Sequence, residues 1–158
     1  MIKGVTVKKL IVHSDVQDVD QPEVKQGILA EILRSDENLF TKFGQSTFTI
    51  TYPGTIKGFH WHEKQDDLWF VATGKVVIVL HDLRPDSPTF KQTETISAGA
   101  DDYKLVVIPI GVAHGFKVLP GEPALLFYHT TEAYNAKNLD EKRIPYNDPS
   151  IGFDWSKV

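Results

Sequence analysis

The chain has 158 residues, with 17 basic and 21 acidic side chains and a formal net charge of −4. This length fits one domain that buries its own core, so we expect a single domain over residues 1–158. The absence of cysteine excludes disulfides and thiolate metal sites, and the acidic balance argues against a nucleic-acid partner. No signal segment and no membrane-length apolar run is present, which predicts a cytoplasmic protein without a membrane partner.

Along the chain, apolar residues recur mostly with a period of two, and glycine or proline separates the short runs. Residues 31–43 could form a turn or two of helix, or equally a loop. Threonines alternate with apolar side chains at positions 47–52, so one face of that strand points to a wet cavity or to solvent. This pattern predicts an all-β double-sheet jelly roll around one cavity, and its clearest strands are residues 45–52, 75–80, 103–108 and 124–130.

The most specific pattern combines an HxH pair, an aspartate and a distant PxGxxH segment. His60 and His62 point to the same side of a strand, because side chains alternate along it. Asp67 follows a short polar connection, and a hairpin would return it to the histidines, while His114 comes from a distant strand. These four residues are a ligand set for a divalent metal such as Zn, Fe, Ni or Mn. Alternatively, the histidines are hydrogen-bonded pocket residues and Asp67 is a solvated or capping group.

Five ordered motifs resemble the dTDP-4-dehydrorhamnose 3,5-epimerase family of cupins, over about residues 27–155. They are KGFH at 57–60, LRPDSPTF at 83–90, IPIGVAHGF at 108–116, FYHTT at 127–131 and YNDPSIGFDW at 146–155. The resemblance implies a homodimeric cupin jelly roll that requires no cofactor. Its cavity would take a nucleotide-linked 4-keto-6-deoxy sugar.

The resemblance also implies roles for individual side chains. His60 would remove the proton next to the ketone, and Tyr128 would donate a proton on the opposite face. The residues expected to bind substrate are Lys57, Gln45, Glu31, His114 and Tyr134.

Four positions depart from the family pattern. Lys57 and Gln26 stand where the family has arginines, and His62 stands where it has a glutamine. Asp67 replaces the active-site lysine, which reverses the charge where the enolate would form.

The partner of His60 is also in question. The sequence ends at Val158, before the segment whose aspartate pairs with the catalytic histidine in the family. We therefore expect His60 to use another orienting group, or none.

Two function classes follow from these observations. The first is an epimerase or isomerase of a nucleotide sugar, in deoxysugar or surface polysaccharide biosynthesis. The second is a metal-dependent or noncatalytic cupin that kept the fold and lost the reaction. In a hybrid, a metal on His62, Asp67 and His114 replaces the lysine as electrophile. If His60 also bound the metal, Asp67 could be the base, and the sequence leaves this choice open.

Overall fold

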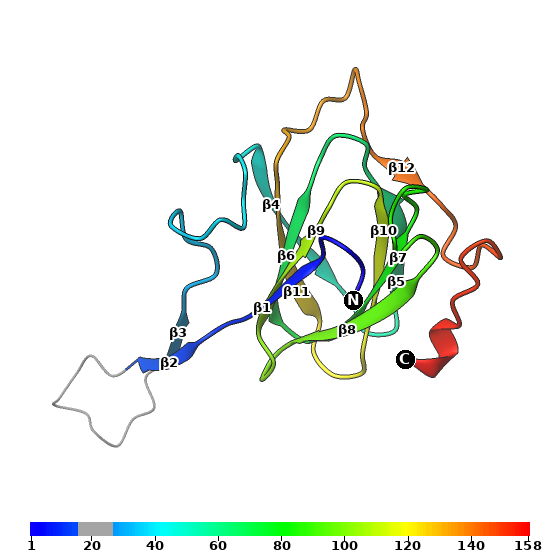
Figure 1. Cartoon of the computed structure of the whole chain (residues 1–158). Helices are drawn as coiled ribbons and strands as arrows, with labels where there is room; N and C mark the ends of the chain where they lie inside the picture. Colours follow the sequence, from blue (N-terminus) through cyan, green and yellow to red (C-terminus); the bar gives the residue numbers. More distant parts are fainter. Residues whose placement is uncertain (16–26) are drawn as a thin grey trace, which may run out of the picture.

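Two five-stranded antiparallel sheets form the body of the computed structural model (Figure 1). The structure describes residues 1–15 and 27–158. The strands are β1 (Thr6–Lys9), β2 (Val12–Asp15), β3 (Gly27–Ala30), β4 (Gln45–Thr51), β5 (Ile56–Trp61), β6 (Asp67–Thr73), β7 (Lys75–Asp82), β8 (Thr93–Gly99), β9 (Lys104–Ile108), β10 (Val112–Val118), β11 (Ala124–Thr130) and β12 (Lys142–Arg143), and a 3₁₀ turn, η1 (Trp155–Lys157), lies near the end.

The first sheet has the order β1-β9-β6-β11-β4 and the second the order β12-β5-β10-β7-β8. Among the described strands, β2 and β3 pair with each other and with no third strand. This arrangement confirms the predicted all-β double-sheet fold, while the prediction of one domain over residues 1–158 stays a prediction. Within the described ranges, no helix is long and apolar enough to cross a membrane.

The four strands expected from the sequence correspond to β4, β7, β9 and β11, with ends shifted by at most two residues. Residues 31–43 form turns, which is the loop alternative. There the Arg34 guanidinium donates to Asp36 and to Glu31, so side-chain bonds brace the turn.

Apolar side chains from both sheets fill the space between them. Trp69 and Val71 of β6, Ile78 of β7 and Phe116 of β10 belong to this buried cluster. On the outer side of the second sheet, Trp155 packs on Phe59 of β5 with ring centroids 5.5 Å apart. Burial of each such side chain contributes about 1.5–3 kcal/mol. The sheets therefore have a rigid apolar base on which polar side chains can be positioned.

Strands β5 and β10 approach each other closely beside the histidines. A Cβ atom at Gly58 would lie 2.8 Å from the Cα of Gly115, and one at Gly115 would lie 2.7 Å from the Lys57 carbonyl oxygen. The pairing register also shifts between His114 and Phe116. Glycine at both positions allows this contact, which sets His60 opposite His114 in the ladder.

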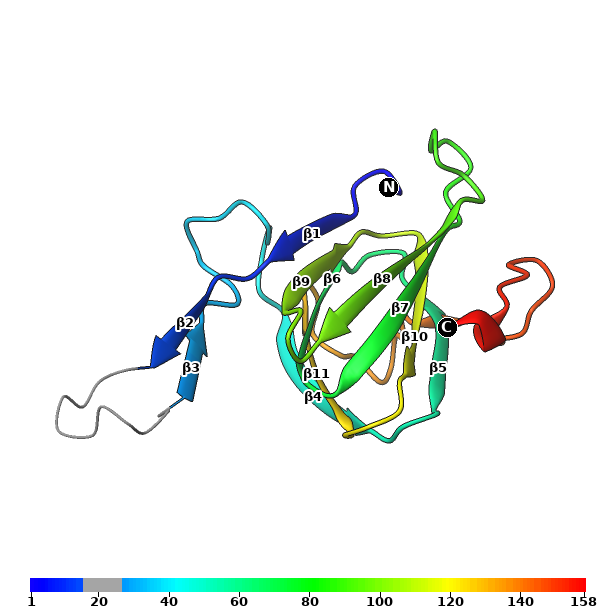
Figure 2. The same ribbon diagram turned by 90° about the horizontal axis from the view of Figure 1, so that it is seen from below.

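The β2–β3 hairpin projects away from the barrel in both views (Figures 1 and 2). Edge strand β4 directs its threonines inward and its apolar side chains outward. Phe48, Ile50 and the following Tyr52 are 61%, 55% and 68% exposed, whereas Thr51 is buried and Thr49 lines the cavity described below. Of the two orientations that the sequence allowed, the threonines thus take the one toward the cavity.

Candidate active site

A cavity of about 380 Å³ opens between the two sheets, with walls from β4, β5, β6, β10 and β11 and from residues 132–143. Eight of the residues singled out from the sequence line it, namely Gln45, Lys57, His60, His62, Asp67, His114, Tyr128 and Tyr134. Glu31 does not line it. That carboxylate lies 59% exposed and forms an ion pair with Arg34 at 3.1 Å, and Gln26 falls outside the described residues.

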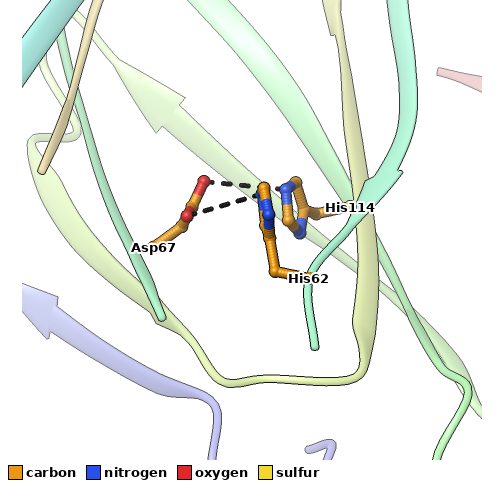
Figure 3. A group of neighbouring side chains, drawn as sticks. All are labelled: His62, Asp67 and His114. Carbon is orange, nitrogen blue, oxygen red and sulfur yellow. Dashed lines mark ion pairs between the residues drawn. The ribbon is translucent and has the colours of Figure 1, made fainter. Parts of the chain in front are cut away.

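Three buried side chains meet on one wall of the cavity (Figure 3). His62 Nε2 lies 3.7 Å from Asp67 Oδ1, and His114 Nε2 lies 3.7 Å from Asp67 Oδ2. The two imidazole rings stack, with centroids 5.5 Å apart. The expected β5–β6 hairpin was wrong, because these strands belong to different sheets. The connection instead crosses between the sheets and brings Asp67 opposite the histidines.

Two side chains that were not singled out as site residues hold the Asp67 carboxylate. Gln65 Nε2 donates to Oδ1 at 2.6 Å, and Trp69 Nε1 donates to Oδ2 at 3.1 Å. Trp69 also belongs to the buried core, so its indole packs as well as donates. Residues 65, 67 and 69 are spaced two apart, and side chains at this spacing point to the same side of an extended segment. This spacing is the sequence signal that could have linked Gln65 and Trp69 to Asp67.

The outer nitrogens of the two buried histidines face oxygen atoms. His114 Nδ1 lies 3.0 Å from the Val112 carbonyl oxygen. His62 Nδ1 lies 3.6 Å from Asp140 Oδ2. Burial lowers the pKa of His114, against the opposing effect of the Asp67 charge, and keeps this imidazole neutral at pH 7.

His60 lies apart from this group and has a different partner. Its Nδ1 is 3.7 Å from Glu141 Oε2, and both side chains are 35% exposed. Strand β12 sets Arg143 opposite His60 in the ladder, and Arg143 Nε donates to Glu141 Oε1 at 2.7 Å. Of the four predicted metal ligands, His62, Asp67 and His114 each place one ligand atom within 4.8 Å of the others, and His60 is not part of this group.

The ionisation of this pair suits proton transfer. Burial lowers the pKa of His60, and the nearby Glu141 charge opposes that effect only in part. Burial raises the pKa of Glu141, but the hydrogen bond from Arg143 and the neighbouring His60 outweigh it and lower the pKa overall. A neutral imidazole thus stands beside a carboxylate at neutral pH.

Tyr128 enters the cavity from β11, at a register position opposite Trp69. Burial raises the pKa of its hydroxyl, and the negative charges of Asp67 and Glu141 raise it further. The phenol therefore carries its proton at neutral pH and can donate it.

The remaining predicted residues lie on the cavity walls or at its rim. Lys57 Nζ donates to Thr49 Oγ1 at 3.0 Å and lies 6.0 Å from the centroid of the Phe116 ring. Gln45 Oε1 accepts a hydrogen bond from the Tyr134 backbone at 2.9 Å. The Tyr134 residue itself is 69% exposed.

The fold and site together define a jelly-roll barrel with imidazole, carboxylate and phenol groups around an internal cavity, as in small-molecule enzymes. Residues 10–158 match the family model described as dTDP-4-dehydrorhamnose 3,5-epimerase, and the chain belongs to this family. This confirms the resemblance found in the sequence, including the cupin-type fold. Membership in the family brings no requirement for a cofactor, as expected.

Two curated relatives match nearly the whole chain. The spore coat polysaccharide biosynthesis protein SpsL of Bacillus subtilis is 50% identical over 156 residues, which cover 99% of this chain and 97% of SpsL. The probable low-salt glycan biosynthesis epimerase Agl13 of Haloferax volcanii is 34% identical over 144 residues, which cover 90% of this chain and 92% of Agl13. The chain is therefore a member of an epimerase family that serves sugar and polysaccharide biosynthesis.

Solved structures agree with this assignment. A dTDP sugar isomerase from Desulfovibrio desulfuricans superimposes with a TM-score of 0.86 and 26% identity, over 99% of this chain and 94% of the other. The RmlC epimerase of Legionella pneumophila, solved in complex with dTDP-4-keto-L-rhamnose, superimposes with a TM-score of 0.80 and 28% identity. The match covers 96% of this chain and 78% of the Legionella chain.

Proposed function

We propose that the protein epimerises a nucleotide-linked 4-keto-6-deoxy sugar by removing a proton next to the ketone, in deoxysugar or surface polysaccharide biosynthesis. The observation that carries this proposal is the His60–Glu141 pair, at 3.7 Å, in a cavity that Tyr128 also lines. A base, its orienting carboxylate and a second proton donor are the groups that such a reaction needs. The Legionella relative, with its bound keto-sugar nucleotide, supports the substrate class.

In the proposed reaction, His60 takes the proton from the carbon beside the ketone, and the bonding electrons move to the ketone oxygen. Glu141, whose Oε2 lies 3.7 Å from Nδ1 of His60, stabilises the imidazolium that forms through its charge. Tyr128 then donates its proton to the opposite face of the carbon, and the enolate electrons form the new bond. Exchange with water restores the proton of Tyr128 and removes that of His60.

Other wall residues serve in binding. Lys57 and Arg143 are cations that line the cavity, and both can meet the diphosphate of a nucleotide sugar. Tyr134, exposed at the rim, offers a surface for a nucleobase. Asp67 is a poorer candidate base than His60, because it is 4% exposed and already accepts two hydrogen bonds.

A second candidate function is a metal-binding cupin that no longer performs the family reaction. The specific observation in its favour is Asp67, which reverses the charge of the family lysine and faces two histidines. Such a protein would bind a metal and a small molecule without exchanging substrate hydrogens.

Hydrogen exchange separates these two functions. The protein is incubated in deuterated water with dTDP-4-keto-6-deoxyglucose, and label at C3 and C5 is measured by mass spectrometry and NMR. We expect label at one or both carbons, and loss of labelling in His60→Ala. His129→Ala is the matched control, because this histidine lies on β11 beside Tyr128 but does not line the cavity. A folded, metal-replete protein that exchanges neither hydrogen would favour the second function.

We further propose that the protein is a homodimer. Exposed apolar side chains gather on β4 and on the β2–β3 arm, where Ile28 and Leu29 are 50% and 49% exposed. Monomeric proteins rarely leave rows of such side chains in water, and an unpaired edge strand invites pairing. A second copy would cover both features. The cytoplasmic location also stays a prediction.

A further inference from the structure

Within residues 1–15 and 27–158, no lysine or arginine side chain is bonded to the buried Asp67 carboxylate. Its side chain is 5% exposed, and its two hydrogen-bond donors, the Gln65 amide and the Trp69 indole, are neutral. Lys57, a cation on the same cavity wall, bonds to Thr49 instead. Burial of a carboxylate is costly unless a positive charge compensates it. The compensating positive charge must then come from the two histidines, either as a proton or as a cation that they bind.

The separation of the ligand atoms suits a metal ion. Each Nε2 lies 3.7 Å from a carboxylate oxygen, which is longer than a normal hydrogen bond. A tetrahedral ion bound at about 2.1 Å by each ligand keeps neighbouring ligand atoms about 3.4 Å apart. One nitrogen or oxygen from each of the three side chains falls within 4.8 Å of the others.

The histidines are also oriented as metal ligands. A carbonyl oxygen only accepts hydrogen bonds, so the 3.0 Å contact with Val112 places a proton on His114 Nδ1. His62 directs its own Nδ1 toward Asp140, at 3.6 Å. In both rings Nε2 faces Asp67 across the gap (Figure 3). His62 Nε2 also lies 3.4 Å from the Gln65 amide nitrogen, which donates, so this ring nitrogen carries a lone pair. Metal-bound histidines show this arrangement, with the second nitrogen directed at a carbonyl or carboxylate.

We propose that His62, Asp67 and His114 bind one divalent first-row transition-metal ion, with Gln65 positioning the carboxylate. Two imidazoles and one carboxylate leave coordination positions open for water or a small molecule. His60 stays outside the coordination sphere, so one cavity holds a metal site and a separate base. The proposal that a metal binds here does not depend on the proposed function. A role for that metal as electrophile for the ketone would rest on the proposed function.

The experiment is a titration of the full-length protein, stripped with a chelator, with Co²⁺ at neutral pH. We expect visible absorption that saturates at one ion per chain, displacement by Zn²⁺, and a thermal midpoint that rises with metal concentration. His62→Gln should abolish the absorption band at one equivalent. Gln65→Leu leaves all three ligands in place and should weaken binding by about 10–100-fold.

His60→Gln is the matched control, because it removes a neighbouring imidazole of the same cavity. We expect it to bind Co²⁺ like the wild type even where hydrogen exchange is lost, so failure of the metal site and failure of the proposed function are distinguishable. Should His62→Gln fail to fold, His114→Gln tests the same site. If the wild type binds no Co²⁺ at one equivalent, the proposal is overturned. A proton shared between Asp67 and a histidine would then be the compensating charge. Equal loss in His60→Gln would overturn the three-ligand assignment.

Discussion

Nδ1 of His60 lies 3.7 Å from Oε2 of Glu141, although 81 positions separate the two residues in the chain (141 − 60). The contact forms because β12, which begins at the next residue, pairs with β5. In the proposed reaction Glu141 takes the orienting position that the sequence left open, and its carboxylate faces Nδ1 so that Nε2 accepts the proton.

Glu141→Gln should therefore lower kcat for epimerisation and hydrogen exchange, while the KM for substrate changes little. The amide keeps the shape but loses the charge that stabilises the imidazolium, and we expect a decrease of about 10–100-fold. The measurement is steady-state kinetics combined with deuterium incorporation. The matched control is Glu63→Gln, since Glu63 pairs with Lys142 at 3.7 Å and does not line the cavity. Equal rates in Glu141→Gln and the wild type would contradict a positioning role.

Tyr128→Phe should separate the two proton transfers. His60 can still remove the substrate hydrogen, so label from deuterated water should continue to enter the sugar. Inversion should fall by about 100-fold or more, because the donor on the opposite face is missing. NMR analysis of the product resolves the two outcomes. Wild-type inversion in this variant would assign the acid to a different group.

The proposed dimer predicts a change of assembly when charge enters the exposed row on β4. Ile50→Glu should convert a dimer to a monomer at micromolar concentration, because a buried unpaired carboxylate would cost several kcal/mol. Size-exclusion chromatography with light scattering measures the mass. Phe90→Glu is the control, since Phe90 is 41% exposed in the β7–β8 connection, away from β4. A monomeric wild type would rule the dimer out.

The sequence could predict the fold class because the strands are short, alternate with a period of two and end at glycine or proline. It could not decide which face of β4 is covered. The alternation of threonine with Phe48 and Ile50 shows two faces, but only the packed sheets show that the threonines point inward. An apolar face turned outward reverses the usual expectation for a strand and motivates the proposed dimer.

The candidate site was predicted in part for a similar reason. The spacing of His62 and His114 identified both buried imidazoles, because the motifs are local. Glu141 and Asp140 were missed, since their contacts with the histidines depend on how β12 meets β5. Asp67 was placed beside the histidines through a hairpin that does not exist, because a period-two pattern does not reveal which sheet a strand joins.

Asp82 supports a prediction about stability. Its side chain is fully buried and accepts hydrogen bonds from Arg84, Ser87 and Thr89. Arg84 also donates to the Lys3 carbonyl at 2.6 Å, so the network ties the N-terminal segment to the β7–β8 connection. Asp82→Asn removes the charge that these donors surround, and we expect a loss of about 3 kcal/mol. In thermal unfolding this corresponds to a midpoint lower by about 6–12 °C.

The same network sets a dependence on pH. Burial raises the pKa of Asp82, but the hydrogen bonds from Arg84, Ser87 and Thr89 outweigh it and hold the pKa well below its ordinary value. A carboxyl with a lowered pKa in the folded state stabilises fully above its unfolded pKa, near 3.9, and loses that contribution as the pH falls further. The difference in unfolding free energy between wild type and Asp82→Asn should therefore be constant from pH 7 to about 5 and shrink below pH 4. Asp86→Asn, an exposed change in the same connection, is the control and should show no such difference. A gap between wild type and Asp82→Asn that stays constant down to pH 3 would mean that packing, rather than the charge of Asp82, stabilises this connection.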